Sequence, residues 1–200
     1  MEIIKDSTFV GTKADCIYEK LLDSSEGFSE MIQKFDGDFP ISHLNYSLDF
    51  TMPDTINGKT SSSSIGSYYI DIDLNGTTLA GRPVLGVART IAHETIHAEM
   101  YRKVKSVGGQ VSMDDFPGIF YYYTNYEDWG HEQMANHYID TFIDILKDFD
   151  NNQHTEQYYS DLAWEGLQGT VAWTSLPQID KTRIVNTIIN LNVNGIKTCN

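Results

Sequence analysis

Two histidines and a glutamate stand at a spacing that suits metal chemistry: His93, Glu94 and His97. Residues 90–100 around them contain no Gly or Pro and are rich in helix formers, which predicts a helix. Residues four apart on a helix lie one turn above each other, so both imidazoles point the same way. Two imidazoles at that spacing can bind one Zn²⁺, and Glu94 stands beside them to accept a proton.

A catalytic zinc ion usually has three protein ligands and one water molecule, so a third ligand is expected downstream. The candidates gather in residues 129–137, where His131, Glu132 and His137 follow one another. Two arrangements fit. In one, the third ligand is a helix histidine, and we favour His131. In the other it is Glu132, with Asn136 four residues later in the place of an acid that would orient the first histidine.

The elements that position these residues follow from hydrophobic periodicity. The motif is expected on a long helix that ends before Gly108 and Gly109, and a second long helix is expected to begin with the third-ligand segment. Residues 53–64 form a loop rich in Gly, Ser and Thr, and residues 121–126 supply tyrosines. The expected helices are 12–23, 28–35, 84–107, 130–149, 155–167 and 178–191, and the expected strands are 44–50 and 68–74.

Length and charge limit the class of protein. Two hundred residues with an apolar fraction of 40% are enough for one globular domain, residues 1–200, with a real core. The formal net charge of -14 argues against nucleic acid and anionic membranes as partners. No apolar run approaches the length of a membrane span, and the first six residues lack the basic-then-apolar pattern of a signal peptide. The oligomeric state does not follow from the sequence.

The two cysteines, Cys16 and Cys199, stand near opposite ends of the chain. In an exported protein they could form a disulfide that joins the ends, whereas in a reducing compartment they would remain thiols. Localisation is therefore open, with export favoured only if the two residues are bonded.

With these residues in view, the chain resembles a zincin metallopeptidase, and within zincins it is most similar to the SprT-like group. Residues 91–98, the strand at 68–74 and the Gly130–His131 pair carry the resemblance, which covers residues 44–149. It implies an α+β fold in which a small, mostly antiparallel sheet packs on an active-site helix and a second long helix, with additional C-terminal helices. It also implies that residues 68–74 form the edge strand of the cleft and pair with extended substrate.

The resemblance implies a zinc-dependent metallopeptidase that acts on a protein or peptide substrate. His93, His97 and His131 would hold Zn²⁺, and Glu94 would be the general base. A tyrosine within residues 121–126 is a candidate donor to the oxyanion. The alternative is a zincin-fold binding module that recognises a partner without cleaving it. The segment 164–173 matches no part of the resemblance and is expected to pack against the core.

Overall fold

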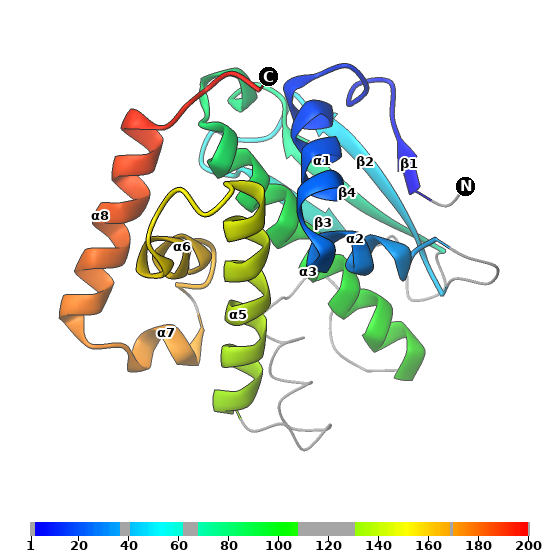
Figure 1. The fold of residues 1–200 in the computed structure, drawn as a ribbon. Coiled ribbons are helices and arrows are strands. Elements are labelled where there is room, and N and C mark those ends of the chain that lie inside the picture. The colour runs from blue at the N-terminus through cyan, green and yellow to red at the C-terminus, as the bar shows by residue number, and fades with distance from the viewer. Residues whose placement is uncertain (1–2, 37–40, 62–67, 108–130, 169, 200) are drawn as a thin grey trace.

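The computed structural model describes residues 3–36, 41–61, 68–107, 131–168 and 170–199, without the side chains of 103–107, 131–138 and 171. Four strands form one sheet in the order β1-β2-β4-β3. Helices pack against one face of this sheet (Figure 1). The strands are β1 (Ile3–Lys5), β2 (His43–Asp49), β3 (Gly58–Ser61) and β4 (Tyr69–Asn75).

The sheet is mixed, and this corrects the expectation of a mostly antiparallel sheet. β1 pairs with β2 and β2 pairs with β4 in parallel, while only β3 pairs with β4 in the antiparallel sense. Parallel neighbours need a crossover connection, which helices α1 (Lys13–Ser24) and α2 (Glu26–Gln33) provide between β1 and β2. The three-residue strand β1 was not expected from the sequence, because three residues show too little periodicity to be recognised.

The two faces of the sheet differ in chemistry, as alternation along the strands requires. Leu44, Tyr46 and Leu48 of β2 are buried, as are Ile70 and Ile72 of β4. The opposite face is polar, where Asn45 donates to Asp71 and Ser47 donates to Asp73. The described helices therefore cover the apolar face of the sheet, and the polar side chains lie on the opposite face.

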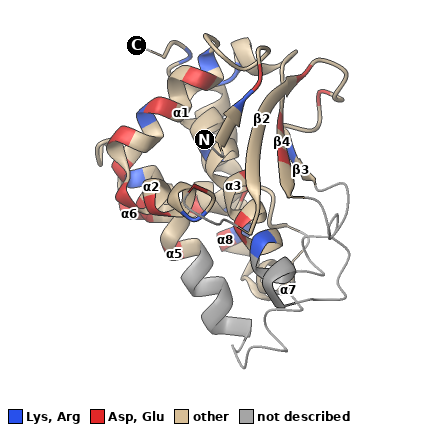
Figure 2. Ribbon diagram, turned by 90° about the vertical axis from the view of Figure 1, so that its right-hand side faces the viewer, with Lys and Arg blue, Asp and Glu red and all other residues tan. Residues whose placement is uncertain are grey.

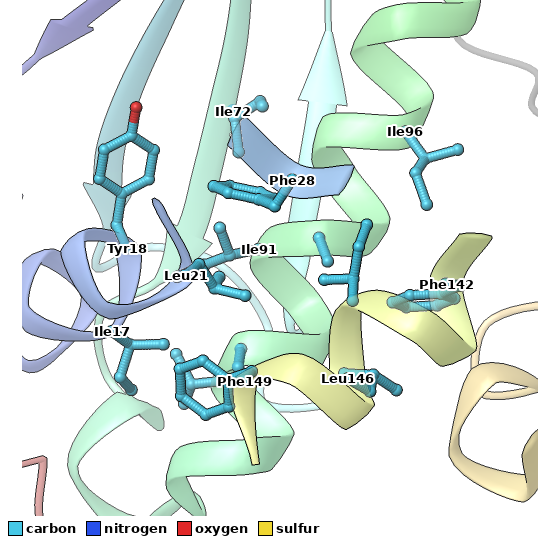
Figure 3. Packing of buried hydrophobic residues seen from close by; sticks show 14 of the residues in the cluster. Ile17, Tyr18, Leu21, Phe28, Ile72, Ile91, Ile96, Phe142, Leu146 and Phe149 are labelled. Atoms are coloured by element: carbon cyan, nitrogen blue, oxygen red, sulfur yellow. The ribbon is translucent and has the colours of Figure 1, made fainter. Parts of the chain in front are cut away.

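The core lies between that apolar face and four helices. Helix α3 (Val84–Val107) contacts β3 and β4, and α1, α2 and α5 (His131–Phe149) pack around it. Figure 3 shows Leu21, Phe28, Ile91 and Phe142 pointing into this common interior. A hydrogen bond of 2.8 Å between the Tyr46 hydroxyl and Thr95 Oγ1 joins β2 to α3. The motif helix is thus the central element of the fold. Its bounds, Val84–Val107, agree with the expected range 84–107.

Strand β3 lies at the edge of the sheet, where the sequence had indicated a loop. Its composition, Gly-Lys-Thr-Ser, has low strand propensity, so pairing with β4 rather than local preference determines it. The buried side chain of Asn75 organises the approach to this strand. Its Nδ2 donates to the carbonyls of Ile56 and Pro53, at 2.8 and 3.0 Å, and its Oδ1 accepts from the backbone N–H of Thr77 at 3.0 Å.

Three further helices follow α5 in the described chain: α6 (Glu156–Ala163), α7 (Val171–Ser175) and α8 (Gln178–Asn194). Helices were expected at 155–167 and 178–191; α6 ends earlier than expected, and the five-residue helix α7 was not expected. The buried carboxylate of Asp161 joins α6 to α8, because it accepts from Arg183 Nε at 3.1 Å and from the Thr187 hydroxyl at 2.9 Å. The C-terminal helices are therefore fixed to one another by a buried polar contact as well as by apolar packing.

A disulfide joins Cys16 of α1 to Cys199 near the C-terminus, with a Cα–Cα distance of 6.3 Å. It closes a loop with a sequence separation of 183 residues.

Acidic positions are spread over several elements, including α1 and β4 (Figure 2). Among the described residues, no helix is both long and apolar enough to cross a membrane.

Candidate metal centre

Helix α3 is buried along most of its described length, and two partly exposed residues within 84–101 mark the candidate site. From Val84 to Tyr101 every residue is buried except His93 and His97, which are partly exposed. A helix packed on all sides normally has apolar residues around its whole circumference. The two imidazoles therefore occupy an opening in the packing around residues 84–101, and they line a pocket of about 490 Å³.

The two imidazoles converge. His93 Nε2 and His97 Nε2 lie 2.9 Å apart, and their ring centroids are 4.6 Å apart. Two nitrogens bound at 2.0–2.1 Å to one tetrahedral zinc ion would lie about 3.3 Å apart, so only a small adjustment separates this geometry from a ligated pair. The donor set also suits zinc, since imidazole nitrogen is among its preferred ligands.

Both histidines are held in the form that binds metal. Burial, together with a smaller effect of the nearby positive charge of Arg89, lowers the pKa of His93 to about 4. Burial also lowers the pKa of His97 well below its usual value, with a smaller contribution from His93. A neutral imidazole offers a lone pair to a metal, whereas a protonated one does not. At neutral pH the pair is therefore ready to bind a cation.

Glu94 lies beside the pair but deeper in the protein, with 7% of its surface exposed. Burial raises its pKa to about 7, against the opposing effect of hydrogen bonds from Thr60. A carboxyl group with a pKa near neutrality is suited to accept and return a proton at physiological pH. Thr60 Oγ1 lies 2.6 Å from Glu94 Oε2 and 2.9 Å from the Glu94 carbonyl oxygen.

One wall of the pocket is the edge strand β3. Gly58 lies so close to α3 that an added Cβ would be 2.9 Å from Thr90 Cγ2 and 3.1 Å from Glu94 Cγ. A larger residue would separate strand and helix. The expectation that residues 68–74 form the edge strand is wrong, because β4 lies between β2 and β3 and both of its edges are paired.

The opposite wall comes from the C-terminal part of the chain. Glu165, Gly166 and Gln168, in the turn after α6, line the same pocket as the two histidines. Glu165 forms an ion pair with Arg89, which lies on α3 one turn before His93. These residues belong to the segment 164–173 that was expected only to pack against the core, and no periodicity or motif in the sequence marks them as part of a site.

Two expectations fall outside the described structure. Helix α5 begins at His131, as expected for a third-ligand segment, but the side chains of His131, Glu132 and His137 lie outside the described residues. Residues 121–126, with the candidate oxyanion tyrosine, also lie outside it. Within the described part of the chain, no group of three His, Cys, Asp or Glu side chains is arranged to hold a metal ion.

Comparisons with protein-family models, with curated proteins and with solved structures found no match. The geometry of the site and the sequence motif therefore carry the evidence for its function.

Proposed function

We propose that this chain is a zinc-dependent metallopeptidase related to the SprT-like zincins. The observation that carries the proposal is the convergence of His93 Nε2 and His97 Nε2 at 2.9 Å in a pocket that also contains Glu94. The two imidazole nitrogens contact each other and Glu94 is hydrogen-bonded to Thr60, so all three side chains are held together at one pocket in the arrangement that a zinc ion uses. Zinc bound there would account for all three groups.

In this proposal His93, His97 and His131 hold the metal. Zinc, when bound, lowers the pKa of a coordinated water molecule towards neutrality and polarises the scissile carbonyl. Glu94 accepts a proton from the water and returns it to the leaving amine. Its burial and its pKa of about 7 support this role, because the carboxyl group can both take and release a proton near neutral pH.

Extended peptide is the substrate form that the pocket suits best. Antiparallel strands alternate between residue pairs that exchange backbone hydrogen bonds and pairs that do not. Asn57 belongs to the first kind, because its carbonyl accepts from the Asn75 N–H. The backbone N–H and C=O groups of Gly58 and Thr60 therefore point away from β4. These groups face the edge of β3 that no described strand pairs with, next to Glu94, where the Thr60 carbonyl also accepts from the Tyr101 hydroxyl at 3.4 Å. A peptide that adds to this edge would pass over the two histidines, with its backbone held by hydrogen bonds to β3.

The runner-up is a binding module that holds zinc but does not cleave its partner. The position of Glu94 favours the enzyme, since a module that only binds has no use for a buried carboxyl group that Thr60 holds beside the two histidines. The two candidates share the metal site and the edge strand, so only a measurement of turnover distinguishes them.

The test combines metal content with cleavage of an unfolded protein. We expect about one zinc ion per chain after dialysis against zinc-containing buffer, and cleavage that a chelator abolishes and added zinc restores. Zinc binding without cleavage of several unfolded substrates would favour the binding module. A chain that binds no zinc would contradict both candidates.

A further inference from the structure

The turn after α6 lies directly against the first candidate ligand. Gly166 has φ +87°, a left-handed conformation that glycine adopts without strain. A Cβ added to Gly166 would be 2.8 Å from His93 Cε1 and 3.2 Å from His93 Nε2. The backbone of Gly166 therefore occupies the space next to the edge of the imidazole that carries the metal-binding nitrogen.

A second group limits the movement of the same ring. Phe142 of α5 lies with its ring centroid 6.0 Å from that of His93 and with an angle of 49° between the planes. Phe142 is fully buried and belongs to the core. With Phe142 and Gly166 both close to its ring, His93 has little freedom to change its side-chain torsions.

An ion pair holds the turn against α3. Arg89 and His93 are four residues apart, so they share one face of the helix. Arg89 is 3% exposed and pairs with Glu165, the residue next to Gly166. A buried guanidinium that loses its partner leaves an uncompensated charge, which makes displacement of the turn unfavourable. The pair therefore couples the position of Gly166 to the helix that carries both histidines.

We propose that the Glu165–Gly166 turn positions His93 for metal binding, with Gly166 fixing the imidazole and the Arg89–Glu165 ion pair fixing the turn. The inference rests on the zinc-binding part of the proposed function. It makes Gly166 and Glu165 positioning residues. It also gives the C-terminal helices a role in the site, because the turn directly follows α6, which Asp161 joins to α8.

A positioning role and a purely structural role have different consequences. A turn that only closes the core would lower stability when altered, but would leave the metal affinity of the folded protein unchanged. A turn that orients a ligand must change the metal affinity as well, since loss of groups that orient ligands typically weakens binding by about 10–100-fold. Zinc affinity of folded protein therefore separates the two roles without any measurement of cleavage.

Gly166→Ala is the principal variant, and Gly11→Ala is its matched control. Gly11 also has a positive φ, +74°, but a Cβ added there meets nothing within 4 Å. Both substitutions introduce the same kind of backbone strain, and only the first introduces a collision with His93. We expect the zinc dissociation constant to rise at least about 10-fold in Gly166→Ala and to be unchanged in Gly11→Ala.

Glu165→Gln tests the ion pair and also covers the case in which Gly166→Ala does not fold. Its control is Asp180→Asn, which breaks the Arg183–Asp180 ion pair between two partly exposed side chains of α8. We expect weaker zinc binding in Glu165→Gln, by about 10-fold, and no change in Asp180→Asn. The absorption spectrum of cobalt-substituted protein should change in the two site variants and not in the controls.

Equal zinc affinities in the wild type, Gly166→Ala and Glu165→Gln would overturn the positioning role while leaving the proposed function intact. A loss of affinity in Gly11→Ala as large as that in Gly166→Ala would also overturn it. If the wild type binds zinc but cleaves nothing, the peptidase assignment fails and the positioning role is still decided by the variants. A wild type without zinc affinity contradicts both.

Discussion

Thr60 on the edge strand is hydrogen-bonded to Glu94 on the motif helix, with 2.6 Å between Thr60 Oγ1 and Glu94 Oε2. The same hydroxyl lies 2.9 Å from the Glu94 carbonyl oxygen. A hydroxyl group has one proton, so Thr60 donates fully to only one of these acceptors at a time. The strand that would receive a peptide is thereby linked to the residue that would receive the proton.

Thr60→Val should lower kcat with little effect on zinc binding. Valine matches the shape of threonine but cannot donate, and a hydrogen bond to a charged group contributes about 1.5–3 kcal/mol, which corresponds to roughly 10–100-fold in rate. Steady-state kinetics on one peptide substrate is the measurement, with zinc content as a control. Thr60→Ser keeps the hydroxyl and should retain most of the activity. Equal losses in both variants would mean that packing, rather than the hydrogen bond, is responsible.

Glu94→Gln should abolish hydrolysis while preserving zinc binding and the fold. Glutamine approximates the shape of glutamate but cannot accept the proton, and general-base catalysis contributes about 10²–10⁴-fold. Turnover of the zinc-loaded variant, together with its circular dichroism spectrum, tests this expectation. Near-normal turnover would remove Glu94 from the mechanism.

His131→Ala should weaken zinc binding by at least about 10–100-fold, taking the loss caused by removing outer-shell partners as a lower limit. Glu132→Ala should weaken it much less. A neutral histidine leaves the metal with its full charge, which favours ionisation of the bound water, whereas a glutamate ligand would partly neutralise it. Zinc titration of both variants decides the assignment, and the opposite order would indicate a site with a glutamate ligand.

His137→Ala belongs in the same zinc titration, because His137 is closer than His131 along α5 to Phe142. Among the described side chains of α5, the ring of Phe142 lies near that of His93, with 6.0 Å between the ring centroids. His131 precedes it by eleven residues and His137 by five, which correspond to about 16 and about 8 Å of helix rise. A larger loss of affinity in His137→Ala than in His131→Ala would move the third ligand along α5 and contradict the His131 assignment.

N-methylation of single amides in a peptide substrate should raise KM at alternate positions only. In an added strand every second residue directs its N–H towards β3, so only those methyl groups block a hydrogen bond. A series of peptides, each with one N-methyl group, tests this periodicity of two. Equal effects at all positions would argue against addition to the edge formed by Gly58 and Thr60.

Removal of the disulfide by Cys16→Ser with Cys199→Ser should lower the free energy of unfolding. A loop that spans nearly the whole chain constrains the unfolded state, and the entropy model gives up to about 4–5 kcal/mol for it. Urea unfolding of the double variant measures the loss. Thiol counting under denaturing, non-reducing conditions should detect no free thiol in protein from an oxidising compartment, and two reactive thiols there would contradict the bond.

Local patterns in the sequence were sufficient to predict the helices and strands whose residue types repeat with a helical or strand period. The spacing of His93 and His97, together with the absence of Gly and Pro around them, predicted the motif helix with the bounds 84–107. The alternation of Leu44 to Phe50 and of Tyr68 to Leu74 predicted β2 and β4. In each case the pattern extends over at least seven residues of continuous chain, and neighbours in sequence determine it.

Only the tertiary structure decided which elements surround His93 and His97, the candidate metal ligands. Thr60 and Gly58 belong to a strand that exists because β4 offers it an edge, and Gly166 reaches His93 because Arg89 and the C-terminal helices hold its turn in place. Such contacts join residues that are distant in the sequence, as Thr60 and Glu94 are at 34 positions apart. A single sequence carries no local signal for them, since pairing and packing between distant segments, not the preferences of the residues themselves, fix their positions.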